Sequence, residues 1–81
     1  MSPRQRKEVD ISTYEGRFAV RLRMLREKAG VNVHALAEKS GVSKTTILNW
    51  ESGIRKPIVS DTFLKLAEAL EVNVRTLMPK E

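Results

Sequence analysis

A short run of polar side chains offers hydrogen-bonding chemistry. Lysine donates hydrogen bonds, threonine donates and accepts them, and asparagine does both through neighbouring amide atoms. Ile47 and Trp50 stand three residues apart, so a helix over this segment buries both on one face and turns the polar side chains outward. The outward residues are Lys44, Thr45, Thr46 and Asn49.

The sequence contains no pattern typical of catalysis or metal binding. It has no cysteine, one histidine and no glycine-rich phosphate loop, and its serines have no recognisable catalytic partners. A lone histidine does not make a metal site, so we expect His34 to lie at the surface. We therefore expect no enzyme activity, no metal and no cofactor.

Two short helices and a tight turn position the polar run. Asn32 is a good N-cap for a helix over residues 33–40, and Ser43 caps a second helix that runs to about Ser52. Gly41 lies between them, where the turn requires a positive φ. Such a pair of helices is typical of DNA-binding proteins. The apolar side chains that can meet in the angle between the helices are Leu36, Ala37, Val42, Ile47 and Trp50.

Three further helices are predicted on either side of this pair. Ser12 and Glu15 have the spacing of a capping box, and a helix then follows that Gly30 ends. Ser60 and Asn73 are N-caps for two more helices. The apolar stripe of the first helix consists of Tyr14, Phe18, Leu22, Leu25 and Ala29.

The fold class that follows is all-α, with one compact five-helix domain over residues 12–81. Residues 1–11 are polar and lack periodicity, which predicts a flexible basic arm.

The formal charge of +5 favours a polyanionic partner, although added solubility explains it equally well. Without cysteines, a signal peptide or a long apolar stretch, we expect a cytoplasmic protein with no membrane partner.

Over about residues 16–78 the sequence resembles the helix-turn-helix family of Cro and the phage repressors. The segments that carry the resemblance are Leu25-Arg26-Glu27-Lys28-Ala29-Gly30, Leu36-Ala37, Gly41-Val42-Ser43, Ile47, Trp50-Glu51-Ser52-Gly53, Arg55-Lys56-Pro57 and Leu66-Ala67-Glu68-Ala69-Leu70 followed by Val72. Three positions depart from the family pattern. Val33 replaces a glutamine that contacts phosphate, the loop after Pro57 is one residue longer, and Glu71 replaces the glycine that ends the fourth helix.

The resemblance implies that the helix over residues 44–52 lies in the major groove of DNA. Lys44 would donate to guanine, Asn49 would pair with adenine, and Thr45 would bond a base edge or touch a thymine methyl group. Thr46 would reach a base or a phosphate. Phosphate contacts are implied for Asn32, the backbone at Val33, Ser43, Ser52, Arg55 and Lys56.

Three side chains near this helix have other implied roles. Arg26 and Glu51 occupy positions that form a partly buried salt bridge in the family. Trp50 follows Ile47 on the inward face, so we expect it to fill the core rather than stack on a base. Leu48 lies off the core stripe, and either it is partly exposed or it packs on a partner subunit.

The function expected from this resemblance is sequence-specific binding of double-stranded DNA by a transcriptional regulator. We expect a repressor that acts as a homodimer on a pseudo-palindromic operator. Three alternatives remain open: an antitoxin-type module that binds a protein partner, a fragment that lacks a carboxyl-terminal domain, and a restriction-modification controller.

Two segments have two possible roles each. Basic residues of the arm, Arg4, Arg6 and Lys7, either follow the minor groove or form a free tail. The apolar ending either forms the dimer interface or closes the core, and consists of Val72, Val74, Leu77 and Met78.

Overall fold

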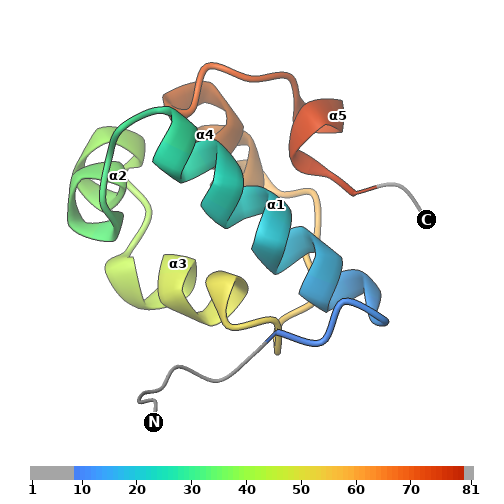
Figure 1. The fold of residues 1–81 in the computed structure, drawn as a ribbon. Helices are drawn as coiled ribbons and strands as arrows, with labels where there is room; N and C mark the ends of the chain where they lie inside the picture. The colour runs from blue at the N-terminus through green and yellow to red at the C-terminus, as the bar shows by residue number, and fades with distance from the viewer. Residues whose placement is uncertain (1–8, 80–81) are drawn as a thin grey trace, which may run out of the picture.

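A computed structural model describes residues 9–79 as an all-helical domain (Figure 1). Within that range there are five helices and no strand, which confirms the predicted fold class. The predicted arm falls mostly outside the described residues, including Arg4, Arg6 and Lys7. The helices are α1 (Tyr14–Lys28), α2 (Val33–Ser40), α3 (Lys44–Glu51), α4 (Asp61–Ala69) and α5 (Val74–Leu77).

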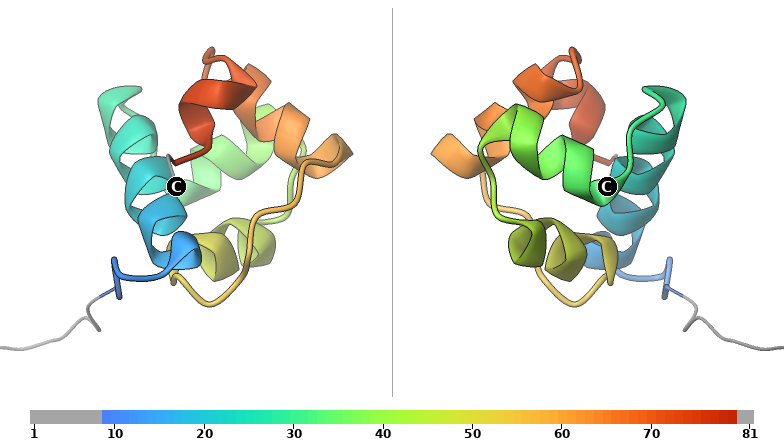
Figure 2. Two further views of the ribbon diagram at one scale, coloured as in Figure 1. Left: turned by 90° about the vertical axis from the view of Figure 1, so that its right-hand side faces the viewer. Right: turned by 90° about the vertical axis from the view of Figure 1, so that its left-hand side faces the viewer.

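Three aromatic side chains join α1, α3 and α4 at the centre of the core. The ring centroids of Phe18 and Trp50 lie 5.6 Å apart, those of Phe18 and Phe63 5.7 Å apart, and those of Trp50 and Phe63 6.0 Å apart. Around this cluster α1 packs against α3 and α5, while α2 packs against α3 and α4. Figure 2 shows that α3 lies at one end of the bundle, with α4 and α5 at the other. One face of α3 is therefore free of other helices.

Side-chain caps fix where the helices after α1 begin. The Asn32 Oδ1 accepts from the backbone N–H of Ala35 at 2.7 Å, and the Ser43 Oγ accepts from that of Thr46 at 3.1 Å. Ser60 caps α4 in the same way. These predicted caps are confirmed, and each satisfies a backbone donor that a helix start leaves without an intrahelical acceptor.

The capping box predicted at the start of α1 is wrong. Thr13 is the N-cap, and its Oγ1 accepts from the backbone N–H of Gly16 at 2.9 Å. Ser12 instead donates through its hydroxyl and its backbone N–H to Asp10 Oδ1, at 2.6 and 2.9 Å. These two hydrogen bonds lower the pKa of Asp10. Because the Asp10 carboxylate holds the Ser12 hydroxyl, the cap moves one residue along the chain.

The apolar ending closes the core of the monomer. Leu77 is fully buried, and Val72, Val74 and Met78 are half-buried and pack against the core. Of the two readings of this segment, the structure supports the one in which it completes the fold. Glu71, just before it, has a φ of 59°, a left-handed conformation that is unfavourable for a residue with a Cβ atom.

Candidate nucleic-acid interface

The turn between α2 and α3 is held by backbone geometry and by one buried serine. Gly41 has a φ of 76° and its N–H donates to the carbonyl of Ala37 at 2.9 Å. The next N–H, that of Val42, donates to the buried Ser40 Oγ at 3.1 Å. The Val42 side chain is buried, so the turn is anchored in the core. This fixes the angle at which α3 leaves α2.

Helix α3 has an inward and an outward face. Ile47 is 0% exposed and Trp50 7% exposed, so the inward face is fully packed. Lys44 and Thr45 are exposed, while Thr46 and Asn49 are half-buried. The four side chains predicted to contact bases therefore lie together on α3, away from its core contacts. Leu48 is also exposed on this helix, at 48%, which leaves its side chain open to solvent or to a partner.

Hydroxyl groups at the two ends of α3 are already hydrogen-bonded within the protein. The Ser43 and Thr46 hydroxyls lie 2.9 Å apart, so one donates to the other and the second proton is left for a ligand. The Ser52 hydroxyl donates to the carbonyl of Asn49 at 2.6 Å. A phosphate oxygen only accepts hydrogen bonds, so a contact from the Ser52 hydroxyl would first require this bond to break.

The start of α2 presents backbone donors to solvent. Asn32 is exposed and uses its amide oxygen as the helix cap, which leaves its NH₂ group as a donor. The N–H groups at the start of a helix have no intrahelical acceptor and lie at the positive end of its dipole. Val33 is half-buried and supplies one of them. His34 is exposed beside Glu38, with 3.5 Å between its Nε2 and the carboxylate.

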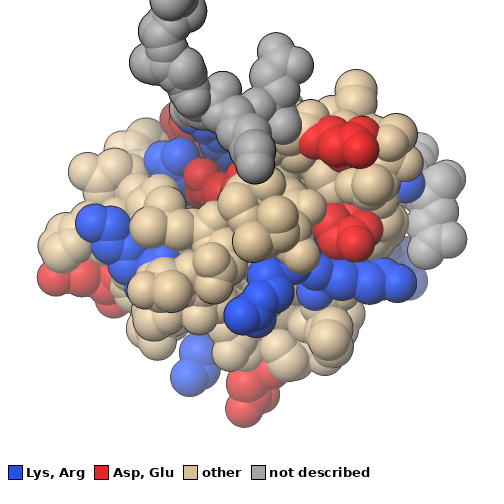
Figure 3. All heavy atoms as spheres, turned by 90° about the horizontal axis from the view of Figure 1, so that it is seen from below, with Lys and Arg blue, Asp and Glu red and all other residues tan. Residues whose placement is uncertain are grey.

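The segment between α3 and α4 carries exposed basic side chains. Arg55 and Lys56 are both exposed, and the buried Pro57 ties the segment to the domain. Figure 3 views the molecule from below, the side on which α3 lies, and shows Lys and Arg atoms interspersed with Asp and Glu atoms around a largely uncharged centre. Arg55 and Lys56 are therefore available to a negatively charged polymer on this side, which also carries acidic groups.

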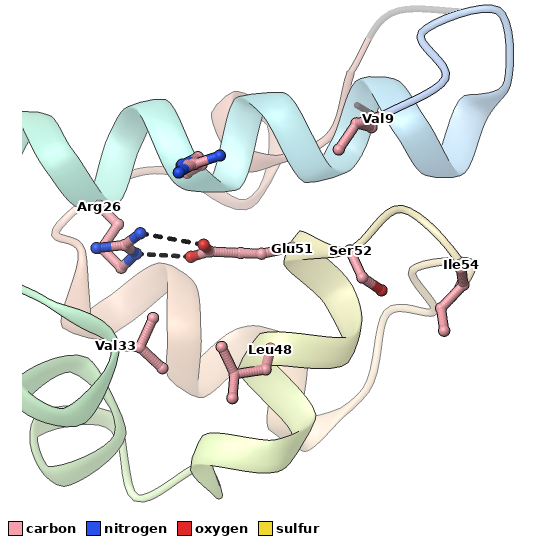
Figure 4. Close-up of a pocket in the computed structure, with 8 residues that line it drawn as sticks. Val9, Arg26, Val33, Leu48, Glu51, Ser52 and Ile54 are labelled. Atoms are coloured by element: carbon pink, nitrogen blue, oxygen red, sulfur yellow. Dashed lines mark hydrogen bonds and ion pairs between the residues drawn. The ribbon is translucent and has the colours of Figure 1, made fainter. Parts of the chain in front are cut away.

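An ion pair fixes the end of α3 to α1 (Figure 4). The Arg26 Nε lies 2.6 Å from Glu51 Oε2, and its Nη2 lies 3.1 Å from Oε1. The remaining Nη1 donates to the carbonyl of Val31 at 3.1 Å. The two side chains are only 12% and 10% exposed, and the hydrogen bonds to Glu51 raise the pKa of Arg26. The guanidinium thus connects α1, the α1–α2 turn and α3 at one point.

Two negative observations hold for the described part of the chain. Residues 9–79 contain no group of three histidine, cysteine, aspartate or glutamate side chains placed to hold a metal ion. No helix among these residues is long and apolar enough to cross a lipid bilayer.

Comparisons with known proteins agree with this architecture. The transcriptional repressor RghR of Bacillus subtilis is 43% identical over 63 residues, which are 78% of this chain and 47% of RghR. The uncharacterized HTH-type transcriptional regulator Rv0474 of Mycobacterium tuberculosis is 41% identical over 56 residues, 69% of this chain and 39% of its own length. This chain therefore spans less than half the length of these curated relatives.

A solved structure and a family model match the same region. The crystal structure of the restriction-modification controller protein C.AhdI from Aeromonas hydrophila superposes with a TM-score of 0.69 at 35% identity, covering 76% of this chain and 92% of that one. The Helix-turn-helix family model matches residues 22–77, which include α2, the turn and α3. This chain belongs to the helix-turn-helix family of Cro and the phage repressors.

Proposed function

We propose that this chain is a sequence-specific, double-stranded DNA-binding transcriptional regulator that acts as a repressor. The observation that carries the proposal is the division of α3 into a packed inward face and a polar outward face next to basic side chains. A helix of this kind fits the major groove, where each base pair presents its own donors, acceptors and methyl groups. The names of RghR and C.AhdI, a repressor and a controller, support a regulatory role.

In this proposal the outward side chains of α3 recognise bases. Lys44 donates to guanine O6 or N7, Asn49 pairs with adenine through its amide, and Thr45 contacts a base edge or a thymine methyl group. Thr46 shares a hydrogen bond with Ser43, so one proton of this pair reaches a base or a phosphate. Recognition comes from these contacts, because phosphate contacts carry no base identity.

Phosphate contacts set the position of α3 on the duplex. The donors are the Asn32 amide, the Val33 backbone N–H, Ser43, and the side chains of Arg55 and Lys56. Ser52 joins them only if its hydroxyl releases the carbonyl of Asn49. With about four to six phosphates per protomer, log K falls with log salt at a slope of roughly −0.9 for each phosphate.

Selection from random duplexes, followed by competition at fixed salt, tests the proposal. We expect enrichment of one sequence that unrelated duplex DNA displaces poorly, together with a steep salt dependence. No enriched sequence would contradict specific recognition. A flat salt dependence would contradict the phosphate contacts.

We also propose that the chain acts as a symmetric dimer in the cytoplasm and has no catalytic role. A single small module contacts one half-site, and two-fold symmetry supplies a second about one helical turn away. Leu77 is buried in the monomer core and Val72 and Val74 pack against it, so we place the interface on other apolar side chains. The exposed candidates are Ile58, Val59 and Leu64. Asp61 and Lys65, which are near them in the sequence and are also exposed, carry opposite charges. Sedimentation equilibrium of Leu64→Glu should show a monomer, and a monomeric parent protein at high concentration would contradict the dimer.

A restriction-modification controller is the second candidate. The likeness to C.AhdI, at 35% identity and a TM-score of 0.69, favours it. A reporter promoter that carries the selected sequence separates the two roles. A repressor only lowers transcription from this promoter, whereas a controller that activates as well raises it at one protein concentration and lowers it at another.

A further inference from the structure

Leu48 is an exposed apolar side chain within a polar row of α3. Lys44, Leu48 and Ser52 follow one another at steps of four, so they share one side of the helix. Lys44 and Ser52 are exposed, and Leu48 is 48% exposed. The leucine contributes nothing to the packed inward face. Its position is instead continuous with the side chains that we propose to contact bases.

Part of the rim of the groove beside Leu48 is apolar. It has a volume of about 510 Å³, and Val33, Leu48 and Ile54 are among its lining residues. Figure 4 shows Val33 at the start of α2 and Leu48 on α3, both on the same side of the Arg26–Glu51 ion pair. Because the two charges of that pair bind each other at 2.6 and 3.1 Å, they leave little demand for a polar ligand. The other lining residues are Val9, Arg23, Arg26, Glu51 and Ser52, so an entering group meets hydrocarbon mainly on the side formed by Val33, Leu48 and Ile54.

We infer that Leu48, together with Val33, contacts the 5-methyl group of a thymine in each half-site. This inference rests on the proposed function and adds a recognition residue to it. In the major groove the only apolar group at a base edge is the thymine methyl, which cytosine lacks. A leucine neither donates nor accepts hydrogen bonds, so it distinguishes bases only through this group. Val33 stands where the family has a polar phosphate contact, which makes the rim apolar on both helices.

The position of Leu48 relative to Lys44 predicts where this thymine lies. Four residues correspond to about one turn of helix, so the two side chains are neighbours along α3. We expect the thymine on a base pair next to the one that Lys44 contacts, on either strand. Thr45 stands three residues before Leu48 on the same outward side of α3, and in the proposed function it contacts a different base pair. The two residues therefore give separable methyl effects.

The test replaces thymine by uracil, which removes the methyl group and keeps the hydrogen bonds. On the selected duplex, each thymine is replaced in turn and Kd is measured at fixed salt for the parent protein, Leu48→Ala, Thr45→Ser and Met24→Ala. We expect one position per half-site at which uracil weakens the parent protein by about fourfold, the effect of burying one methyl-sized group. Leu48→Ala should bind thymine and uracil equally there.

The other variants serve as matched controls. Thr45→Ser keeps the hydroxyl group and loses the methyl group. It should leave the uracil effect at the Leu48 position unchanged, and any uracil effect that it removes should lie at a different thymine. Met24, on α1, is similarly exposed and belongs to neither the proposed DNA contacts nor the proposed dimer interface, so Met24→Ala should keep both the affinity and the uracil effect of the parent protein. Thermal melts should show Leu48→Ala folded, because the side chain is half-exposed.

Four results would overturn the inference. A uracil effect that persists unchanged in Leu48→Ala, or the absence of any such effect, shows that Leu48 contacts no thymine methyl. Weakened dimerisation of Leu48→Ala in sedimentation, with the uracil effect retained, shows that the residue packs on a second subunit. If selection enriches no sequence at all, the proposed function fails and this inference fails with it, whereas an enriched sequence without the Leu48 effect removes only the inference.

Discussion

The inward and outward faces of α3 belong to the same eight residues and serve opposite purposes. Inward, Ile47 and Trp50 are buried and Glu51 is held by Arg26. Outward, Lys44 and Thr45 have no packing role. In the proposed function, stability and recognition are therefore carried by different atoms of one helix. Changes to the inward face should act on folding, and changes to the outward face should act on the choice of DNA.

Trp50→Ala should have the largest effect on stability. The indole lies between Phe18 and Phe63, and its removal leaves a cavity where α1, α3 and α4 meet. Truncating a buried aromatic side chain costs about 3–5 kcal/mol, which approaches the whole stability of a small domain. Denaturant unfolding followed by circular dichroism should show this loss. A near-normal midpoint would mean that the inward face does not determine stability.

Arg26→Ala and Glu51→Ala should each lower the free energy of unfolding by about 3 kcal/mol. Either change leaves a largely buried charge without its partner, and Arg26 also loses its bond to the Val31 carbonyl. Thermal or denaturant melts measure the effect. The control is Arg23→Ala, since Arg23 pairs with Glu27 at 3.5 Å near the surface and should contribute less than about 1 kcal/mol. Equal midpoints for Arg26→Ala and Arg23→Ala would contradict the special role of the inward pair.

The triple variant Lys44→Ala, Thr45→Ala and Asn49→Ala should lose DNA preference and keep its stability. Each base contact contributes about 1–3 kcal/mol to discrimination, so losing three should lower preference for the selected duplex over unrelated DNA by at least about 100-fold. Unfolding should change by less than about 1 kcal/mol, because none of the three is fully buried. Competition binding and a melt on the same sample measure both quantities. Retained preference in a folded variant would refute recognition by this face.

Sequence patterns predicted the frame of the site because its signals are local. The caps at Asn32 and Ser43 and the turn at Gly41 each depend on residues within a few positions. The start of α1 was predicted one residue early because Asp10 competes for the Ser12 hydroxyl. Gly16 shows the same limit, since a Cβ atom there would lie 1.7 Å from the Asp10 carbonyl oxygen, a contact that no helical periodicity reveals.

Other features depend on tertiary packing and were left undecided for that reason. Val72, Val74 and Leu77 have the same apolar pattern whether they close a core or form an interface, and only the fold distinguishes the two. Leu48 is similar, because its exposure depends on how α1 and α2 border α3. The groove beside it could not be predicted, since its lining comes from four separate segments.

Glu71→Gly should give the smallest effect and should act on folding alone. The residue has a φ of 59°, follows α4, and stands where the family has glycine. Glycine adopts this conformation without strain, although it also gains freedom in the unfolded chain, so we expect a net stabilisation of about 0.5–1 kcal/mol. Calorimetry should show a higher Tm. Affinity and preference for the selected duplex should be unchanged.

The control Glu71→Ala separates backbone strain from charge. Both variants lose the ion pair in which the Glu71 carboxylate lies 3.7 Å from Lys39 Nζ, and both ends of this pair are exposed, so its loss costs little. Only glycine also removes the Cβ atom. If alanine stabilises the protein as much as glycine does, the gain comes from removing the carboxylate and not from the left-handed backbone. If glycine alone stabilises it and binding stays unchanged, stability can be raised without touching either face of α3, which is what the separation of the two faces requires.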